Sequence, residues 1–208
     1  MLERVYFISQ QTETKTHLTA IEEALKAGCR LVQLRVKKEP EAVVLEQAIK
    51  AKDLCDRYNA KLIVNDFPHV AKTVGAWGIH VGLQDLSPVA VRAIVGPEMK
   101  VGGTANTFGH ILQRVQEGVD YIGLGPFRFT STKEKLSPIL GLEGYQRIMD
   151  QVKQAGIQLP IIAIGGILSG YVPGLRDAGI HGVAVSGAIL TALDQRSEVE
   201  KINKLFSY

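Results

Sequence analysis

Short apolar runs alternate with amphipathic segments along the whole chain, and successive runs recur about every 25 residues. A short apolar run bounded by turn residues predicts a buried strand, whereas apolar positions three or four apart predict a helix. We predict strands at residues 5–9, 31–36, 61–64, 78–81, 100–103, 121–124, 161–164 and 182–185. We predict helices at residues 17–27, 42–58, 68–74, 88–95, 108–117, 142–154, 170–178 and 190–206.

The number and order of these segments predict the fold class. Eight strand–helix units in 208 residues are typical of a (β/α)8 TIM barrel, because an open doubly wound sheet rarely holds so many parallel strands. The length and the 46% hydrophobic content favour one α/β domain over residues 1–208. TIM-barrel enzymes carry their active sites at the carboxyl ends of the strands, so polar residues there are the first candidates.

Charge and apolar content limit the possible partners. The net charge is +3 and the basic residues are spread along the sequence, so we expect no nucleic-acid partner. The sequence has no apolar run of about 18 residues, and the segment MLERVYFISQ does not resemble a secretory leader. We therefore expect a soluble, cytoplasmic protein without membrane association, with Cys29 and Cys55 as buried free thiols. Monomer and homo-oligomer both stay open.

Three polar residues alternate with apolar ones in LVQLRVKK. Gln33, Arg35 and Lys37 would share one face of an extended strand, because successive side chains point to opposite faces. Two cations and an amide inside a barrel mouth are costly to bury without an anionic partner. The pattern predicts an anion-binding face, and a solvated strand end is the alternative.

Two aspartates closely follow the third and fourth predicted strands, which are neighbours in a barrel. Asp66 and Asp85 can therefore converge, and Asn65 lies beside the first of them. Adjacent carboxylates repel unless a proton or cation lies between them, and Mg²⁺ binds one or two carboxylates together with substrate phosphates. The sequence predicts a magnesium site. The alternative is a helix cap at Asp66 and a turn at Asp85.

The longest predicted connection, PFRFTSTKEKLSPILGLEG, follows the sixth strand. Connections of more than about 12 residues in compact domains are usually functional or disordered. Hydroxyl groups and backbone amides beside a lysine suit phosphate oxygens, and a flexible solvated loop is the alternative. The candidate phosphate ligands of this loop are Thr130, Ser131, Thr132 and Lys133.

The seventh and eighth strands end in small residues. Gly165 and Gly166 follow one strand, and Ser186 and Gly187 follow the other. Loops after these two strands of TIM barrels often bind phosphate through backbone N–H groups, and glycine permits close approach. We predict a phosphate site here, with tight turns as the alternative.

Taken in order, the motifs QLRVK, ND, HVGLQD, GPFRFTSTK, AIGGI and VAVSGAI resemble those of the thiamine phosphate synthase family over nearly the whole chain. The resemblance implies a TIM-barrel enzyme with small-molecule substrates. It would condense 4-amino-5-hydroxymethyl-2-methylpyrimidine diphosphate with 4-methyl-5-(2-phosphoethyl)thiazole, or its carboxylated form. The products are thiamine phosphate and pyrophosphate, and Mg²⁺ is the implied cofactor.

The resemblance also assigns roles to residues of this chain. The metal carboxylates fall on Asp66 and Asp85. The pyrimidine-diphosphate contacts fall on Gln33, Arg35, Lys37, Asn65, Thr104 and Lys133. The thiazole-phosphate contacts fall on Thr130, Ser131, Thr132, Gly166, Ser186 and Gly187. Among these, Arg35, Lys37 and Lys133 would be the catalytic cations that meet the charge on the departing pyrophosphate.

The chain departs from the family pattern at several positions. The family usually has Ser-x-His-Thr where this chain has Thr104 to Thr107, so an asparagine, Asn106, replaces the histidine. Leu83 replaces a frequent glutamine and Phe67 a frequent polar residue. The related thiazole tautomerase uses that histidine, and an amide has no useful pKa for proton transfer. A tautomerase-like paralogue and a non-catalytic barrel that binds thiazole or thiamine phosphate are the alternatives to the synthase.

The histidines add little to this interpretation. His80 lies within the fourth predicted strand, and we expect it to be a satisfied strand residue rather than a catalyst. The others fall in helix or loop segments, where we expect no convergent partners: His17, His69, His110 and His181.

Overall fold

The computed structural model describes residues 2–129 and 138–207, and these form a closed barrel of eight parallel strands in sequence order. The last strand pairs with the first, with Val5 opposite Val183. The fold class predicted from the sequence is confirmed. The strands are β1 (Val5–Ile8), β2 (Leu31–Leu34), β3 (Lys61–Asn65), β4 (Gly78–Val81), β5 (Lys100–Ala105), β6 (Tyr121–Leu124), β7 (Ile161–Ile164) and β8 (Gly182–Val185).

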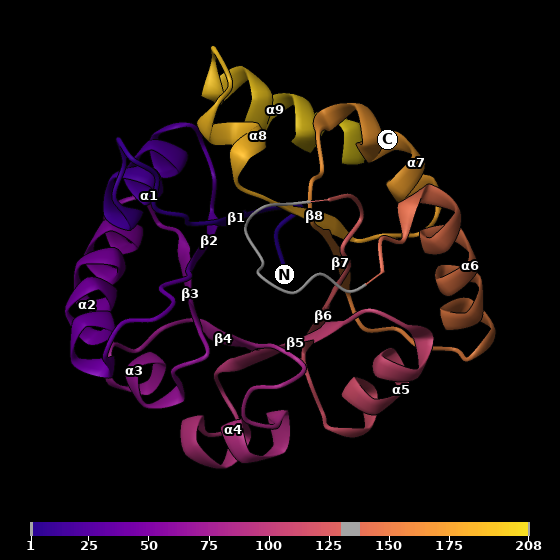
Figure 1. The fold of residues 1–208 in the computed structure, drawn as a ribbon, viewed down its shortest axis with the longest axis horizontal. Coiled ribbons are helices and arrows are strands. Elements are labelled where there is room, and N and C mark those ends of the chain that lie inside the picture. Colours follow the sequence, from indigo (N-terminus) through magenta and orange to yellow (C-terminus); the bar gives the residue numbers. More distant parts are fainter. Residues whose placement is uncertain (1, 130–137, 208) are drawn as a thin grey trace.

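Helices surround the barrel on the outside (Figure 1). Each strand is followed by a helical segment that leads back to the amino end of the next strand or, after β8, ends the described chain. They are α1 (His17–Lys26), α2 (Glu41–Arg57), α3 (Pro68–Thr73), α4 (Pro88–Val95), α5 (Phe108–Gln116), α6 (Gly141–Gln154), the 3₁₀ turn η1 (Ser169–Tyr171), α7 (Val172–Asp177), α8 (Gly187–Leu190) and α9 (Gln195–Phe206).

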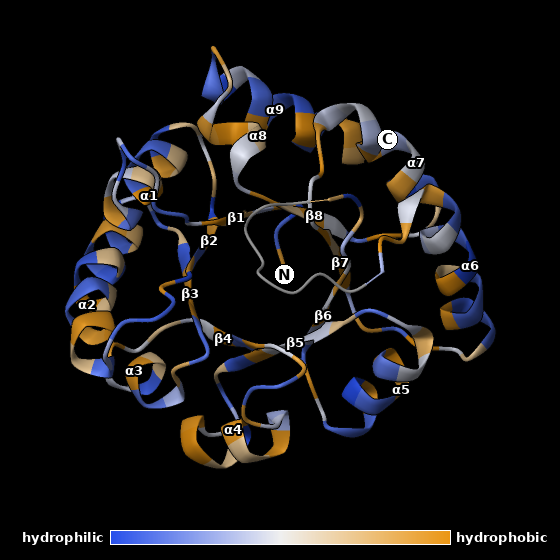
Figure 2. Cartoon of the chain, in the orientation of Figure 1, coloured by the Kyte–Doolittle hydropathy of each residue, from blue (hydrophilic) through white to orange (hydrophobic). Residues whose placement is uncertain are grey.

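Strand residues alternate between two buried layers. Leu62 and Val64 of β3 pack outward in the large core beneath the helices, while Ile63 points into the barrel. Tyr6, Leu31, Ile63, Tyr121, Ile162 and Ala184 form the interior cluster. Both faces of the parallel sheet are therefore buried, which explains why the strands read as nearly continuous apolar runs. The helices mix hydrophobic and hydrophilic positions, as expected for a layer between core and solvent (Figure 2).

The last predicted helix is wrong as one continuous segment. The structure has the short helix α8, a break, and then α9. The side chain of Asp194 accepts a hydrogen bond of 3.0 Å from the backbone N–H of Ser197 and so caps a new helix. Leu193, just before this cap, is fully exposed. An apolar residue in this position continues the helical pattern in the sequence without belonging to a helix.

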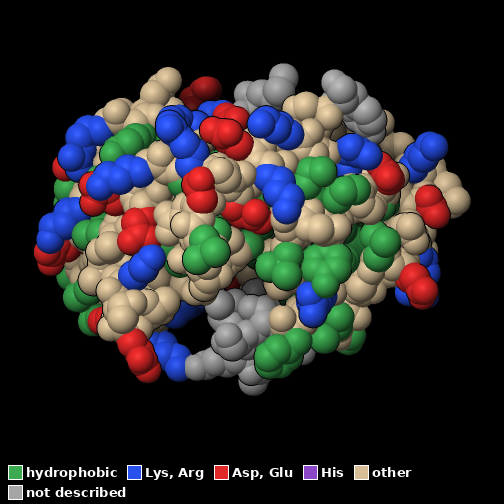
Figure 3. All heavy atoms as spheres, turned by 90° about the horizontal axis from the view of Figure 1, so that it is seen from above, with side chains coloured by type: hydrophobic (Ala, Val, Ile, Leu, Met, Phe, Trp, Pro, Cys, Tyr) green, Lys and Arg blue, Asp and Glu red, His purple; other side chains and the backbone are tan. Residues whose placement is uncertain are grey.

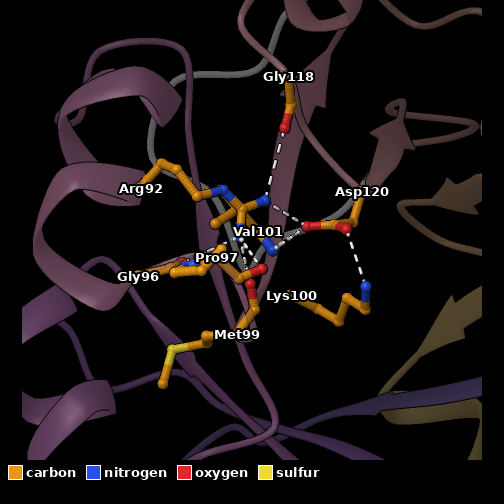
Figure 4. A network of polar contacts seen from close by, with 8 residues as sticks. All are labelled: Arg92, Gly96, Pro97, Met99, Lys100, Val101, Gly118 and Asp120. Carbon is orange, nitrogen blue, oxygen red and sulfur yellow. Dashed lines mark hydrogen bonds and ion pairs between the residues drawn. The ribbon is translucent and has the colours of Figure 1, made fainter.

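The amino end of the barrel is tied together by one carboxylate (Figure 4). Asp120, just before β6, accepts hydrogen bonds from the backbone N–H of Val101 at 2.8 Å, from Arg92 at 2.5 Å and from Lys100 at 3.1 Å. Arg92 also donates to the carbonyl of Met99 at 2.5 Å. Burial acts to raise the pKa of Asp120, but these donors outweigh it and hold that pKa below its ordinary value.

The exposed surface carries both signs of charge. Acidic and basic side chains are interspersed on the face drawn in Figure 3. Within residues 2–129 and 138–207, no helix is both long and apolar enough to cross a membrane. Cys29 and Cys55 are buried and free, as predicted.

Candidate active site

The strand β2 ends earlier than predicted, and this changes where its polar residues lie. Gln33 points into the barrel, where its amide Nε2 donates to the Tyr6 hydroxyl at 2.5 Å. Arg35 and Lys37 follow the strand, so the prediction of three alternating positions within one strand is wrong. The backbone N–H of Arg35 donates instead to the Ser9 hydroxyl at 3.0 Å.

That same Ser9 hydroxyl lies 2.9 Å from Nδ1 of His17, the first residue of α1. Burial, and then the positive charge of Arg35, lower the pKa of His17. His17 thus has convergent partners, contrary to the expectation from the sequence. Ser9 and His17 fix the chain that carries Arg35, and only the three-dimensional structure brings them together.

The two aspartates converge at the carboxyl ends of β3 and β4, as the topology predicts. Their carboxyl groups are within hydrogen-bonding reach, and Lys37 forms an ion pair with Asp66. Asp66 does not cap α3, since Phe67 occupies the cap position without a side-chain hydrogen bond. Asp85 does close a turn, because it accepts from the backbone N–H of Gly82 at 2.7 Å.

The pKa values of the two carboxyl groups shift in opposite directions. Burial raises the pKa of Asp66 to about 6, opposed by Lys37 and helped by Asp85. For Asp85, burial also acts upward, but hydrogen bonds with Asp66 and the Gly82 N–H outweigh it and lower the pKa. The charges of both carboxylates also counter the effect of burial on the nearby Arg35, whose pKa is lowered. A proton shared by two adjacent carboxyl groups occupies the place that a cation can take.

Three buried polar atoms around this mouth have no hydrogen-bond partner among the described residues. They are Asn65 Nδ2, Asp66 Oδ1 and Ser186 Oγ. An unpaired buried donor or acceptor is costly, so each is expected to meet a ligand atom. Ser186 Oγ lies at the end of β8, whereas the other two lie at the end of β3.

The oxygen donors of Asp66 and Asp85 fit Mg²⁺. The unpartnered Asp66 Oδ1 and the adjacent Asp85 supply the hard carboxylate ligands that this ion prefers. The described residues contain no cluster of three or more His, Cys, Asp or Glu side chains that could hold a metal. Mg²⁺ needs no such cluster, because it keeps several waters and takes further oxygens from substrate phosphates.

A buried arginine holds the end of β5 in place through hydrogen bonds. Arg114 donates to the carbonyl of Thr104 at 3.0 Å and to that of Gly82 at 2.9 Å, and pairs with Glu117 at 2.6 Å. The side-chain amide of Asn106 donates to the carbonyl of Gly125. The amide that replaces the family's histidine therefore joins the ends of β5 and β6.

The glycines after β7 allow a close approach of two chain segments. Gly165 and Gly166 have φ values of 98° and 67°, and a Cβ on Gly166 would lie 2.9 Å from the carbonyl oxygen of Phe129. Gly187, after β8, has open space where a Cβ would lie. Both positions reach the same mouth, since β7 and β8 are paired. Four predicted phosphate ligands, Thr130, Ser131, Thr132 and Lys133, lie outside the described residues.

His80 is satisfied within the barrel, as predicted. Its two ring nitrogens lie 3.2 Å from the Tyr121 hydroxyl and 3.0 Å from the Thr104 hydroxyl. Sequence reasoning missed the two tyrosines of the interior, Tyr6 and Tyr121. Their only sequence signal is a polar tip on an otherwise apolar strand.

Comparison with known proteins connects this geometry to one family. Residues 5–189 match the family described as thiamine monophosphate synthase. The chain is 44% identical over 199 residues to the thiamine-phosphate synthase of Phocaeicola vulgatus, covering 96% of each protein. It is 36% identical over 204 residues to thiamine-phosphate synthase 1 of Aquifex aeolicus, covering 97% of this chain and 92% of the relative.

Solved structures agree. The thiamine phosphate pyrophosphorylase of Pyrococcus furiosus superposes with a TM-score of 0.83 at 27% identity, over 98% of this chain and 95% of that one. A 3-hexulose-6-phosphate synthase shares only the fold, with a TM-score of 0.69 at 11% identity over 99% of this chain and 100% of that one. By sequence and by fold, the chain belongs to the thiamine monophosphate synthase family.

Proposed function

We propose that this protein is a Mg²⁺-dependent transferase that makes thiamine phosphate. It joins 4-amino-5-hydroxymethyl-2-methylpyrimidine diphosphate to 4-methyl-5-(2-phosphoethyl)thiazole, or to its carboxylated form. The C–O bond between the pyrimidine methylene and the diphosphate breaks, and the thiazole nitrogen forms the new C–N bond. Pyrophosphate leaves with the electron pair of the broken bond.

The convergence of Asp66 and Asp85 beside two cations carries this proposal. Asp66 Oδ1 is buried without a partner in the described part of the chain, and Lys37 pairs with the other oxygen of the same carboxyl group. When bound there, Mg²⁺ would supply positive charge to the departing pyrophosphate. A site that holds both carboxylates and cations suits a metal-bound polyphosphate better than a simple anion.

The residues of the chain have separate tasks in this reaction. Arg35 and Lys37 would bind the diphosphate, and their charge becomes more favourable as negative charge builds on the leaving group. Asn65, whose Nδ2 has no partner within residues 2–129 and 138–207, would donate to a diphosphate oxygen. Ser186, at the other side of the mouth, would bind the phosphate of the thiazole. The step needs no protein nucleophile, because the electron-rich pyrimidine can stabilise the carbon that loses the diphosphate.

Neither alternative function gains support. The amide of Asn106 donates to the Gly125 carbonyl and has no pKa suited to proton transfer, which disfavours a thiazole tautomerase. A non-catalytic barrel that only binds thiazole phosphate would have no use for two converging carboxyl groups.

Pyrophosphate release by the purified protein tests the proposal. We expect release only when the pyrimidine diphosphate, the thiazole phosphate and Mg²⁺ are all present. A chelator should abolish release, and added Mg²⁺ should restore it. Release that needs only one substrate, or that persists with chelator, would contradict the assigned reaction or its metal requirement. Running the assay with plain and carboxylated thiazole phosphate identifies the acceptor.

A further inference from the structure

Five side chains form a continuous hydrogen-bonded chain across the barrel interior. Nε2 of Gln33 lies 2.5 Å from the Tyr6 hydroxyl, which lies 3.2 Å from the Tyr121 hydroxyl. His80 continues the chain, with Nδ1 3.2 Å from the Tyr121 hydroxyl and Nε2 3.0 Å from the Thr104 hydroxyl. We call this set the interior polar chain. It begins and ends on residues predicted to bind the pyrimidine diphosphate, Gln33 and Thr104, and its three middle members have no predicted role in binding.

The barrel makes room for this chain with two glycines. A Cβ on Gly102 would lie 2.5 Å from the Tyr121 hydroxyl oxygen, and a Cβ on Gly123 would lie 3.1 Å from Cε1 of His80. Real Cβ atoms essentially never approach so closely as the first of these distances. The Tyr121 ring therefore occupies space that glycine on the neighbouring strand leaves open, and the His80 ring lies in tight contact with Gly123. The position of the chain is built into the backbone of β5 and β6.

The orientation of the Gln33 amide sets the direction in which the links can run. Burial raises the pKa of both tyrosines, so each hydroxyl keeps one proton to donate. Since an amide NH₂ only donates, Tyr6 accepts from Gln33. The buried Tyr6 proton then needs an acceptor, and among the described residues the Tyr121 hydroxyl lies within reach.

The same counting continues to the end of the chain. In this order the proton of Tyr121 goes to Nδ1 of His80, which accepts it when the ring is neutral with its proton on Nε2. A neutral imidazole that accepts at Nδ1 carries its proton on Nε2, so His80 donates to Thr104. The Thr104 hydroxyl is thereby left with a proton for which no described residue is an acceptor.

We propose that Tyr6, Tyr121 and His80 are positioning residues that make Thr104 a hydrogen-bond donor to the diphosphate and turn the Gln33 carbonyl oxygen toward the pyrimidine. Phosphate oxygens only accept, so they need a donor at Thr104. None of the described residues donates to Oε1 of Gln33, which suits the exocyclic amino group of the pyrimidine. The inference rests on the proposed function and adds to it a source of specificity.

The chain couples two contacts that are otherwise separate. If the order of donors were reversed, Thr104 would donate to His80 and present only lone pairs to the diphosphate. Gln33 would then have to accept from Tyr6 and present its NH₂ to the pyrimidine. The first arrangement therefore offers the diphosphate a donor and the exocyclic amino group an acceptor, and the reversed one offers neither of these.

Tyr121→Phe breaks the chain at its centre while keeping the ring that packs on Gly102. We expect kcat/KM for the pyrimidine diphosphate to fall about 10- to 100-fold, as for one lost hydrogen bond to a charged group. KM for thiazole phosphate should stay within about twofold of the original value, since its predicted contacts lie elsewhere. Tyr145→Phe is the matched control, because it removes a buried tyrosine hydroxyl that donates to the Leu124 carbonyl outside the chain.

A defect in Tyr145→Phe of the same size and selectivity would show that any buried hydroxyl matters, and would overturn the inference. The same holds if Tyr121→Phe retains kcat/KM for the pyrimidine diphosphate within about twofold. If the unmodified protein releases no pyrophosphate with both substrates, the proposed function fails, and the direction of the chain must be tested by structure alone.

The tautomer of His80 provides that second test, because it is measured in the unmodified protein and does not depend on activity. ¹⁵N NMR of histidine-labelled protein distinguishes a protonated Nε2 from a protonated Nδ1, and the signal is assigned by its absence in His80→Asn. We expect the proton on Nε2, and a mixture of tautomers in Tyr121→Phe. A proton on Nδ1 in the unmodified protein would reverse the chain and overturn the inference, whatever the activity.

Discussion

Two partly buried carboxyl groups at opposite ends of the barrel have opposite surroundings. At the amino end, Asp120 accepts from a backbone N–H and two cations, and its pKa is lowered. At the carboxyl end, Asp66 keeps one oxygen without a partner among the described residues, and its pKa is raised. An aspartate side chain thus has hydrogen-bond donors around it at the amino end, whereas at the carboxyl end one of its oxygens has no donor among the described residues.

The difference separates stability from function within one fold. A carboxylate with all its donors in place contributes to the folded state, whereas an unpaired buried oxygen costs free energy until a ligand arrives. TIM barrels place catalytic residues at the carboxyl end and stabilising ones at the amino end. We expect substitutions at the two ends to separate in the same way.

The largest expected effect is on activity, in Asp66→Asn. Asparagine tolerates the φ of 66° at this position, so the backbone should be unchanged. Loss of a metal carboxylate should lower kcat/KM about 100-fold or more, or about 2.7 kcal/mol. The free energy of unfolding should change by less than about 1 kcal/mol, because the charged form is already disfavoured by burial. Steady-state kinetics and urea unfolding measure the two quantities, and a large loss of stability with retained activity would reverse our assignment of this end.

Asp120→Asn is the matched substitution at the amino end. The amide keeps the shape but loses the charge that faces Arg92 and Lys100, so we expect unfolding to become easier by about 1–2 kcal/mol. The group is partly exposed, and solvent screening keeps the effect at this modest level. Activity per folded molecule should be unchanged within about twofold. If this variant lost activity as Asp66→Asn does, the two ends would not be separable.

The smallest expected effect is a pH dependence of the difference in stability between the original protein and Asp120→Asn. The pKa of Asp120 is lower in the folded state than its ordinary value of 3.8. Its contribution is therefore fully present above about pH 5 and is lost as the pH falls below about 4, through the folded-state pKa. The difference in urea midpoint between the original protein and Asp120→Asn should be constant from pH 7 to 5 and shrink at lower pH. Shrinkage already between pH 7 and 6 would assign the stabilisation to another group.

The sequence predicts the barrel well because its strands are buried on both faces. Runs such as those around Ile63 and Ile79 are continuous, short and evenly spaced, and few folds accommodate eight of them. The convergence of Asp66 and Asp85 is predictable for the same reason, since it needs only the order of the strands. Their role as metal ligands remains a prediction.

What the sequence does not reveal depends on where each strand ends and which way a side chain turns. Arg35 leaves the strand because its N–H meets Ser9, and His17 joins them from another element. Asn106 reads as a lost histidine, yet its amide binds the Gly125 carbonyl. The interior polar chain is made of side chains from five strands, so no local sequence pattern predicts it.

The pairing of β8 with β1 has a consequence for the growing polypeptide. Val5 meets Val183 only after most of the chain has been made, so the ring cannot close during the earlier part of synthesis. Until then, both outer strands carry unpaired backbone groups, which are the usual starting points of aggregation. A nascent chain of this protein that has formed its first strands therefore exposes unpaired strand edges until β8 is made and pairs with β1.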